Sequence, residues 1–321
     1  MWGENVTSAS LARVTIEGKG SEDSYGVYAE GKESLTMTLT DVRISRVGTG
    51  VYAEKGTLMM KDGTTIEFTG NYGVSVGNNV TKAELTRVTI EGQSKGYGVY
   101  AVGSETLEMI LDGVTISGVQ MGVKVERGVL KMTGKSTIDF MGDGWGVMVG
   151  DKVESASLKN VTIEGRDSGY GVYAVGKEEM TMTLDDVRIS KVEVGVYAKK
   201  GMLKMTEGSV TDFADYGVKL GSAVTSASLA RVTIEGDEGD GSGYGVYAVG
   251  GTNLEMTLDG VTISGVKKGV RMEGKSLTIS GHSTISFMGD YGIGVGSSVK
   301  NVSLKDVTIT GQNKGKGTRV Y

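Results

Sequence analysis

Hydrophobic and polar residues alternate along this chain in short runs, and turn residues separate the runs. Leu35, Met37 and Leu39 alternate with polar neighbours, and Val42 and Ile44 continue the pattern after a turn. A period of two residues is typical of β-strands with one buried face. The 3.6-residue period of an amphipathic helix occurs nowhere, so the pattern predicts strands along the whole chain.

The runs belong to a repeat whose clearest mark is a Gly followed by Val or Ile, here called the landmark Gly. It occurs as Gly26, Gly50, Gly73, Gly98, Gly122, Gly146, Gly171, Gly195, Gly217, Gly245, Gly269 and Gly292. Gly317 begins a further unit with Thr in place of Val. Most steps are 22–25 residues, while the phrase Val-Thr-Ile recurs at steps of 71–75 residues, so three short units form one superrepeat.

Stacking of these units predicts an all-β fold, a right-handed parallel β-helix. We expect a solenoid of about 13 rungs of ~24 residues, with a three-rung superrepeat of ~73 residues. The residue two positions after the landmark Val or Ile is Ala, Val, Leu or Met in every rung, as at Ala29, Val125 and Leu220, which predicts an inward ladder. The landmark Gly is expected at a corner, where a positive φ or a close backbone approach excludes a Cβ atom.

Two other repeat architectures fit the sequence less well. A leucine-rich repeat would need its Leu/Asn signature and a helical return segment, and a propeller blade would need a period of about 40–45 residues. Because a solenoid grows by adding rungs, we expect residues 1–321 to form a single β-helix domain.

Charge and composition exclude several classes of protein. The net charge is −5, from 34 basic and 39 acidic residues, whereas a nucleic-acid-binding surface needs a dominant basic footprint. No Cys is present, which excludes disulfides, thiolate nucleophiles and zinc–thiolate sites. No apolar run approaches the ~20 residues that span a bilayer, so we expect no membrane insertion by this chain. The chain begins and ends within the repeat, and we expect it to be a fragment of a longer precursor.

Four recurring phrases suggest a family. They are Val-Thr-Ile-Glu-Gly at 14–18, Tyr-Gly-Val-Tyr-Ala at 25–29, Met-Thr-Leu-Asp-Asp-Val-Arg-Ile-Ser at 182–190 and Gly-Asp-Tyr-Gly-Ile at 289–293. Together they resemble the passenger domains of Bartonella autotransporters, nearest to the proangiogenic factor group, over essentially the whole chain. The resemblance implies export through a C-terminal outer-membrane translocator, a location outside the cell or on the bacterial surface, and action on host cells. The implied partner is a host cell-surface protein, and specifically an endothelial VEGF-type receptor for a signalling ligand.

Many β-helices act on polysaccharides, so the carboxylates need scrutiny. Asp41, Asp112, Asp185 and Asp259 recur three rungs apart, or roughly 14 Å, whereas glycosidase carboxylates lie about 5–9.5 Å apart. Tight turns favour Asp, and we interpret this series as turn residues. Ser168 follows an Asp as in a serine nucleophile region, but the only histidine, His282, is five rungs away. We expect no catalytic residue, no cofactor and no metal.

One loop could hold a cation. Residues 236–243 bring three carboxylates together among glycines, a composition that suits Ca²⁺. The same composition is typical of a solvated insertion, and the loop accounts for the single 28-residue step. The insertion is the preferred interpretation.

The tyrosines indicate where a partner binds. Seven of the fourteen precede a landmark Gly and six lie two residues after it. The second position alternates with the inward ladder, so its side chains are expected to face outward. The resulting exposed stripe contains Tyr28, Tyr52, Tyr100, Lys124, Tyr173, Tyr197, Lys219, Tyr247 and Arg271. Tyr and Arg are common binding hot spots, although stacking between rungs alone also explains such a column.

Three functions remain open from the sequence. The first is a non-enzymatic virulence factor that binds a host cell-surface protein through the stripe. The second is a passive adhesin or structural stalk, which would bind little or would bind glycosaminoglycan through the basic positions. The third is a polysaccharide lyase or hydrolase.

Overall fold

The computed structural model describes residues 6–237, 242–249, 251–312 and 318–320. The chain divides into two compact units, residues 1–163 (unit 1) and residues 164–321 (unit 2). Each is an all-β parallel solenoid; together they make about 12 rungs of ~24 residues, with no helix in the described ranges. The predicted β-solenoid is therefore confirmed. The thirteenth unit was expected from Gly317, which lies outside the described residues.

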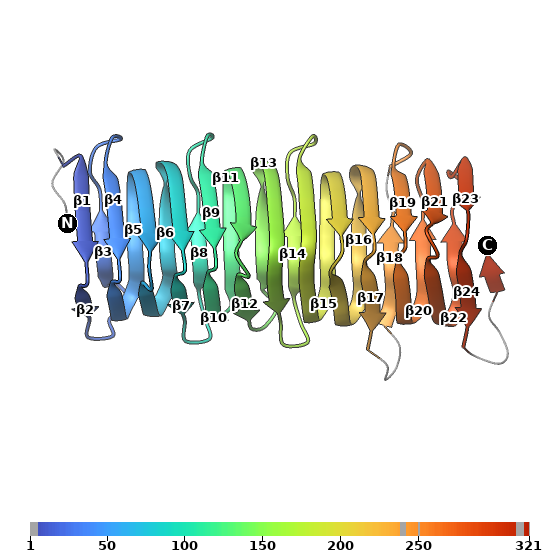
Figure 1. Ribbon diagram of the computed structural model, residues 1–321, viewed down its shortest axis with the longest axis horizontal. Helices are drawn as coiled ribbons and strands as arrows, with labels where there is room; N and C mark the ends of the chain where they lie inside the picture. Colours follow the sequence, from blue (N-terminus) through green and yellow to red (C-terminus); the bar gives the residue numbers. More distant parts are fainter. Residues whose placement is uncertain (1–5, 238–241, 250, 313–317, 321) are drawn as a thin grey trace. The chain divides into compact units, whose positions relative to one another are not determined.

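Unit 1 contains six landmark glycines and the strands β1 to β13 (Figure 1). The strands are β1 (Ser8–Ala12), β2 (Thr15–Glu17), β3 (Tyr25–Ala29), β4 (Thr36–Thr40), β5 (Arg43–Lys61), β6 (Thr65–Thr86), β7 (Thr89–Glu91), β8 (Tyr97–Ala101), β9 (Glu108–Asp112), β10 (Thr115–Val119), β11 (Met121–Thr133), β12 (Thr137–Phe140) and β13 (Trp145–Glu164). β13 ends one residue beyond the boundary of the unit.

Unit 2 contains the other six landmark glycines and the remaining strands. They are β14 (Tyr170–Ala174), β15 (Thr181–Thr206), β16 (Ser209–Ala230), β17 (Thr233–Gly236), β18 (Ser242–Ala248), β19 (Glu255–Asp259), β20 (Thr262–Met272), β21 (Ser276–Ser280), β22 (Thr284–Val295), β23 (Asn301–Leu304), β24 (Thr308–Gly311) and β25 (Thr318–Val320). Described residues of the unit contain no helix long and apolar enough to cross a membrane, and the same holds for unit 1.

Several strands are longer than the short runs that the sequence predicts. β5 has 19 residues, β6 has 22 and β15 has 26, because each continues around a corner of its rung. Between β5 and β6 the pairing resumes at Lys55 and Asn79 after a register shift next to Ala53. Parallel hydrogen bonding therefore persists through the corner, and what we expected to be separate strands is one bent strand.

Ladders of like side chains fill the core. In unit 1 one ladder runs, residue by residue in register, through Ile16, Ile44, Ile66, Ile90, Ile116 and Ile138. β-Branched side chains suit this arrangement because they pack well on a pleated surface and interlock with the same residue in the neighbouring strand. The predicted inward ladder is confirmed in both units, since Ala29, Val125, Leu220 and Met272 are at most 1% exposed.

The superrepeat has a physical basis in side-chain volume. All four phenylalanines of the chain, Phe68, Phe140, Phe213 and Phe287, are almost completely buried, two in each unit. In unit 2, Phe213 pairs with Gly236 and Phe287 with Gly311 of the next rung. A large ring in one rung therefore occupies the space that a Gly leaves in the next. A rung with a buried Phe needs a neighbouring rung with a Gly at the matching position, so rungs recur as a set and not singly. The phenylalanines themselves recur at this interval of ~73 residues, which accounts for the superrepeat.

The landmark positions require Gly because they have no room for a side chain, and not because their backbone conformation is unusual. Gly26 lies inside β3, and its φ is outside the left-handed region. A Cβ atom on Gly26 would lie only 2.3 Å from Cγ2 of Ile44 in the next rung. Of the two explanations offered for this column, close approach is therefore the correct one.

Candidate binding surface

Within each unit the predicted stripe forms an in-register ladder, here called the outer ladder. In unit 1 it runs through Tyr28, Tyr52, Ser75, Tyr100, Lys124 and Met148. In unit 2 it runs through Tyr173, Tyr197, Lys219, Tyr247, Arg271 and Gly294. All nine residues predicted for the stripe thus lie on two ladders of the same kind, one in each unit.

The outer-ladder side chains face outward but are only partly exposed. Tyr28 is half-buried, whereas its neighbours Val27 and Ala29 are 4% and 0% exposed. The other eight predicted residues are also half-buried. The expectation of a freely exposed stripe is wrong in this respect, because the rings and stems pack against a second column of side chains.

The second column consists of the residues that precede the landmark glycines, here called the second ladder. In unit 1 it contains Tyr25, Thr49, Tyr72, Tyr97 and Met121 in register. In unit 2 it contains Tyr170, Val194, Tyr216, Tyr244, Lys268 and Tyr291. Both ladders contribute rings to the same surface, so the candidate surface is two columns wide rather than one.

Tyrosines from the two ladders gather into clusters of three. Unit 1 has the clusters Tyr25, Tyr28, Tyr52 and Tyr72, Tyr97, Tyr100, with ring centroids 5.0–6.1 Å apart. Unit 2 has Tyr170, Tyr173, Tyr197 and Tyr216, Tyr244, Tyr247, with centroids 4.7–6.3 Å apart. These distances fall in the range of favourable stacked and edge-to-face pairs. Stacking therefore contributes to the rigidity of the surface, as the second interpretation of the stripe anticipated.

Lysines lie over the tyrosine rings, mainly in unit 2. The Nζ atom of Lys219 is 5.0 Å from the ring centroid of Tyr197 and 4.5 Å from that of Tyr216. Lys199 lies 5.0 Å from Tyr173, a second cation–π contact of the same kind. Such contacts hold an ammonium group at the surface while its stem packs against the ring.

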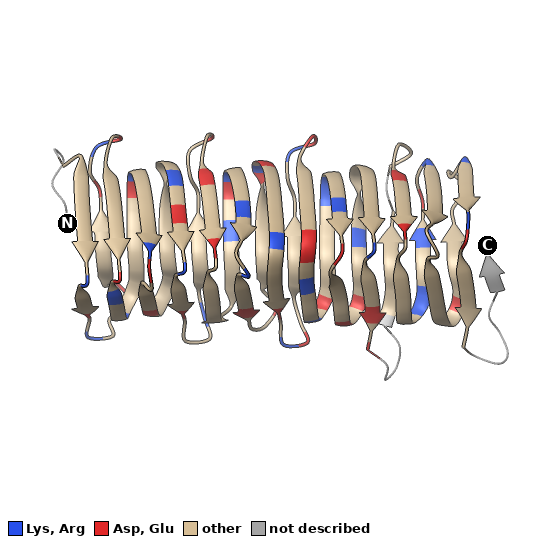
Figure 2. Ribbon diagram, viewed as in Figure 1, with Lys and Arg blue, Asp and Glu red and all other residues tan. Residues whose placement is uncertain are grey.

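Some cations of the surface are neutralised by a carboxylate on the same strand. Lys124 forms a 2.7 Å salt bridge with Glu126, and Arg271 forms a 2.5 Å salt bridge with Glu273. Burial is the largest single influence and lowers the pKa of Lys124, but the hydrogen bond to Glu126 and the negative charges nearby together raise the pKa above its ordinary value. Figure 2 shows acidic and basic residues interspersed along the strands of each unit.

Hydrogen bonds to tyrosine hold two further cations of the surface, Lys199 and Lys268. A hydrogen bond to Tyr173 raises the pKa of Lys199, and one to Tyr244 raises the pKa of Lys268. Both lysines therefore carry a full positive charge at neutral pH. Sequence reasoning missed both residues as parts of the surface. The sequence did contain a signal for each: Lys199 lies two residues after Tyr197, and Lys268 directly precedes the landmark Gly269.

Of the recurring aspartates, only Asp41 lies in a turn as expected; Asp112 and Asp259 are the last residues of β9 and β19, and Asp185 lies within β15. Asp41 has a left-handed φ of 50° in the turn between β4 and β5. The carboxylate of Asp112 accepts a 2.7 Å hydrogen bond from Thr133 in unit 1. Asp259 accepts a 2.8 Å bond from Ser280 in unit 2. The carboxylates of Asp112 and Asp259 thus each join the end of one strand to the end of a strand in the neighbouring rung.

The remaining candidates from the sequence do not assemble into a site. Ser168 lies in a bend before β14, and His282 is exposed in the turn between β21 and β22. No hydrogen bond joins the two in the part of unit 2 that the structure describes. The Ca²⁺ candidate loop falls largely on residues 238–241, which lie outside the described ranges. Among the described residues no group of three or more His, Cys, Asp and Glu side chains could hold a metal ion.

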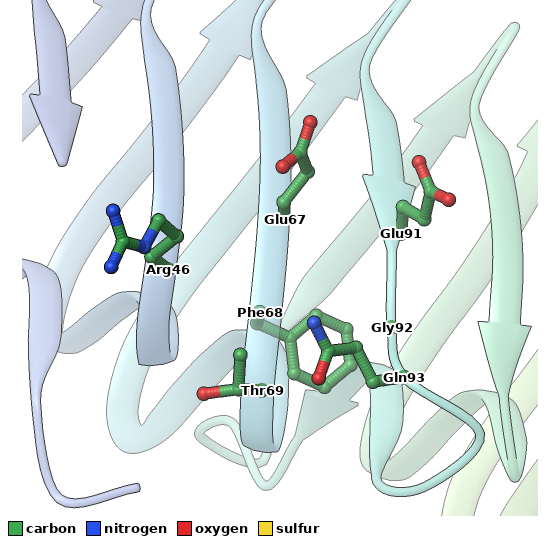
Figure 3. A pocket seen from close by; sticks show the side chains of 7 residues that line it. All are labelled: Arg46, Glu67, Phe68, Thr69, Glu91, Gly92 and Gln93. Carbon is green, nitrogen blue, oxygen red and sulfur yellow. The ribbon is translucent and has the colours of Figure 1, made fainter. Parts of the chain in front are cut away.

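A shallow pocket in unit 1 brings together two carboxylates that the sequence did not single out. It has a volume of about 230 Å³ and is lined by Arg46, Glu67, Phe68, Thr69, Glu91, Gly92 and Gln93 (Figure 3). Glu67 and Glu91 lie opposite each other on β6 and β7. Both are exposed, and Arg46 points away from them toward Glu17, to which it is bridged at 2.9 Å. A catalytic carboxylic acid needs a desolvated setting, which this open pocket does not offer.

Comparisons with protein-family models, with curated proteins and with solved structures find no match to this chain. The fold class is thus established by the structure alone.

Proposed function

We propose that this chain is an autotransporter-type passenger, secreted or exposed on a bacterial surface, that binds a host cell-surface protein without catalysing a reaction. The observation that carries the proposal is the pair of outer ladders, where tyrosines and cations stand in register. Large rings with a polar end and basic groups are the side chains that most often dominate binding energy. The partner that the family resemblance implies is an endothelial VEGF-type receptor, which makes the chain a proangiogenic ligand.

The geometry supports binding better than catalysis. The clustered tyrosines lie on strands and pack on one another, and all but exposed Tyr25 are half-buried. Enzyme sites are usually concave and enclose their substrate, whereas protein partners bind broad, open surfaces. Glu67 and Glu91, a pair of carboxylates on adjacent rungs that lines a pocket of unit 1, are open to solvent.

The decisive experiment measures binding and signalling together. Purified chain is applied to endothelial cells, and cell binding and VEGF-receptor phosphorylation are recorded, with heat-unfolded chain as the control. The variant Tyr173→Ser, Tyr197→Ser, Arg271→Ser is expected to lose binding while circular dichroism shows an unchanged β signal. A control variant, Lys204→Ser with Thr257→Ala, changes residues outside both ladders and is expected to bind normally. Unchanged binding by the first variant would remove the outer ladder of unit 2 from the proposal.

A passive adhesin or stalk is the second candidate, and one observation favours it. The rings of each cluster pack mainly on one another, as in the nearly parallel pair Tyr216 and Tyr244 at 13°. Such packing stiffens a solenoid without any partner. Cell binding that occurs without receptor phosphorylation would favour this candidate over a signalling ligand. Turnover of soluble polyuronates or neutral glycans, tested with added Ca²⁺, would instead establish the enzyme alternative.

A further inference from the structure

The two units carry the same arrangement of tyrosines. The cluster Tyr25, Tyr28, Tyr52 of unit 1 corresponds to Tyr170, Tyr173, Tyr197 of unit 2, and Tyr72, Tyr97, Tyr100 corresponds to Tyr216, Tyr244, Tyr247. In each case the members occupy the same ladder positions and the same order of rungs. Because the tyrosines match, unit 1 serves as an internal reference for the side chains that surround the clusters in unit 2.

The difference is charge at four equivalent positions around the clusters. Unit 1 has Glu54, Ser75, Met121 and Lys124 there, whose charges cancel. Unit 2 has Lys199, Lys219, Lys268 and Arg271, all cations. The chain as a whole is acidic, so four cations on one tyrosine scaffold, three of them absent from unit 1, are a local departure from its composition.

In unit 2 the cations and rings form a continuous array, here called the lysine–tyrosine lattice. Lys199 lies over Tyr173 and Tyr197, and Lys219 lies over Tyr197 and Tyr216. Lys268 lies over Tyr244 and Tyr291, at 4.9 and 5.7 Å. With rungs spaced at ~4.8 Å, the ammonium groups from Lys199 to Lys268 extend over roughly 14 Å. In the described part of unit 1 the only equivalent contact is Lys124 over Tyr100, at 5.4 Å.

Two of these cations have no carboxylate partner among the residues that the structure describes. Neither Lys199 nor Lys219 forms a salt bridge with any carboxylate that the structure describes. Arg271 is paired with Glu273, and Lys268 is 3.6 Å from exposed Asp290. An ammonium group over a ring retains hydrogen-bond donors that point to solvent. At Lys199 and Lys219 the lattice thus presents positive groups that an anion can reach without first breaking an ion pair to a described carboxylate.

We propose that the lysine–tyrosine lattice of unit 2 binds a linear anionic polysaccharide, with its sulfate or carboxylate groups on Lys199, Lys219 and Lys268. This inference rests on the proposed function in one respect, namely that the ladders face the host cell. Cations in three rungs of the same stack match a ligand whose negative groups recur along a chain, and the tyrosine hydroxyl groups can bond the sugar hydroxyls. A flat lattice suits an extended ligand, whereas a small anion would need an enclosing pocket.

The same geometry argues against two other polyanions. Single-stranded nucleic acid binds by stacking its bases on free aromatic faces, but here the faces are covered by neighbouring rings and by ammonium groups. An acidic peptide would gain most by adding as a β-strand to a free edge. β16 is already paired on both sides, with β15 and with β18, so no such edge is available at the lattice.

The test measures binding of the full chain to immobilised heparin, with chondroitin sulfate and a single-stranded oligonucleotide of similar charge as comparison probes. The variant Lys199→Glu, Lys219→Ser gives unit 2 the residues that unit 1 has at these positions. We expect a loss of affinity of at least tenfold, about the effect of one charge-assisted hydrogen bond. The control variant Lys204→Glu, Lys300→Ser makes the same change in net charge at exposed positions outside the lattice, and is expected to bind almost as well as the native chain.

Each outcome bears on the inference separately from the proposed function. Equal losses in the two variants would show that only bulk charge matters and would overturn the inference, as would tighter binding of the oligonucleotide than of heparin.

Endothelial cells treated with glycosaminoglycan lyases provide the second arm. Weaker binding to treated cells, with the lattice variant unaffected by treatment, supports the inference. Full binding to treated cells overturns it but leaves a protein receptor intact, whereas no binding to any cell overturns the proposed function.

Discussion

A Cβ atom on Gly98 would lie 2.4 Å from Cγ2 of Ile116, the next member of the isoleucine ladder in unit 1. The carbonyl oxygen of Gly122 would be 2.8 Å away on the following strand. The φ of Gly98 is not in the left-handed region, so an L-residue could adopt its backbone conformation. What excludes a side chain is the close approach of the neighbouring rung.

We therefore expect Gly98→Ala to destabilise the fold by about 3 kcal/mol, because the methyl group overpacks the core. Gly20→Ala is the informative contrast. Its φ of +81° strains an L-residue, but a Cβ atom there meets nothing within 4 Å. Its cost should stay near 1–2 kcal/mol, from backbone conformation alone. Urea unfolding followed by circular dichroism gives both values, and equal losses would contradict the steric explanation.

The repeat made the columns of the surface predictable, but not the contacts within them. A step of 22–25 residues combined with a period of two places Tyr100 beside Lys124 from the sequence alone. The same pattern does not show that Lys124 is bridged to Glu126, or that Lys199 lies over Tyr173. Those contacts depend on the rotamers of long side chains, and some of these side chains come from the neighbouring column. The prediction of the stripe considered only one column and therefore could not include them.

The turns show a second limit of the sequence. The serine of Gly134-Lys135-Ser136 looks like an ordinary turn residue, yet it is completely buried. Its hydroxyl group accepts a 3.0 Å hydrogen bond from the amide of Val114, 22 residues earlier, and donates a 2.7 Å bond to the carbonyl of Thr133. Only the stacking of the two rungs brings these groups together, so local turn chemistry could not reveal the role.

Replacing this hydroxyl group should be costly. Ser136→Ala removes the hydroxyl group to which the buried amide of Val114 is bonded, whereas the carbonyl of Thr133 still accepts from the amides of Gly113 and Ser136. We expect a loss of about 1–3 kcal/mol in the free energy of unfolding. Ser157→Ala changes an exposed serine of the same unit and should stay within about ±0.5 kcal/mol. Hydrogen exchange adds a local readout, because the amide of Val114 should lose protection only in the first variant. Retained protection would mean that water replaces the hydroxyl group.

High pH should weaken the tyrosine clusters of unit 1. Burial, and then the charge of Glu54, raises the pKa of Tyr52 above its ordinary value of 10.0. Burial, and then Glu126, does the same for Tyr100. Because the folded-state pKa is the higher one, the protonated rings stabilise the fold fully below the unfolded-state pKa of about 10, and this stability is lost as pH rises through the folded-state values.

The measurement for this prediction is a pair of titrations. The midpoint of urea unfolding should be flat up to about pH 9 and should fall above about pH 10. Tyrosinate absorbance of the folded chain should show a group of late-titrating rings. Glu54→Gln removes one cause of the shift at Tyr52, so its titration should move toward the ordinary value. An alkaline transition that is identical in the folded and unfolded chain would contradict the prediction.

The internal duplication permits a gain-of-function experiment, which is the stronger test of the lysine–tyrosine lattice. Glu54→Lys with Ser75→Lys gives unit 1 the lysines that unit 2 has at these positions, because Ser75 pairs with Tyr52 as Lys219 pairs with Tyr197. A second lattice should then form on the clusters of unit 1, and the chain should bind a second equivalent of heparin oligosaccharide. Glu108→Lys with Thr137→Lys makes the same change in net charge at exposed positions on β9 and β12. Calorimetry gives the stoichiometry directly. A second equivalent in the first variant alone means that cations on a tyrosine scaffold are sufficient to create the site, whereas unchanged stoichiometry in a correctly folded variant means that they are not.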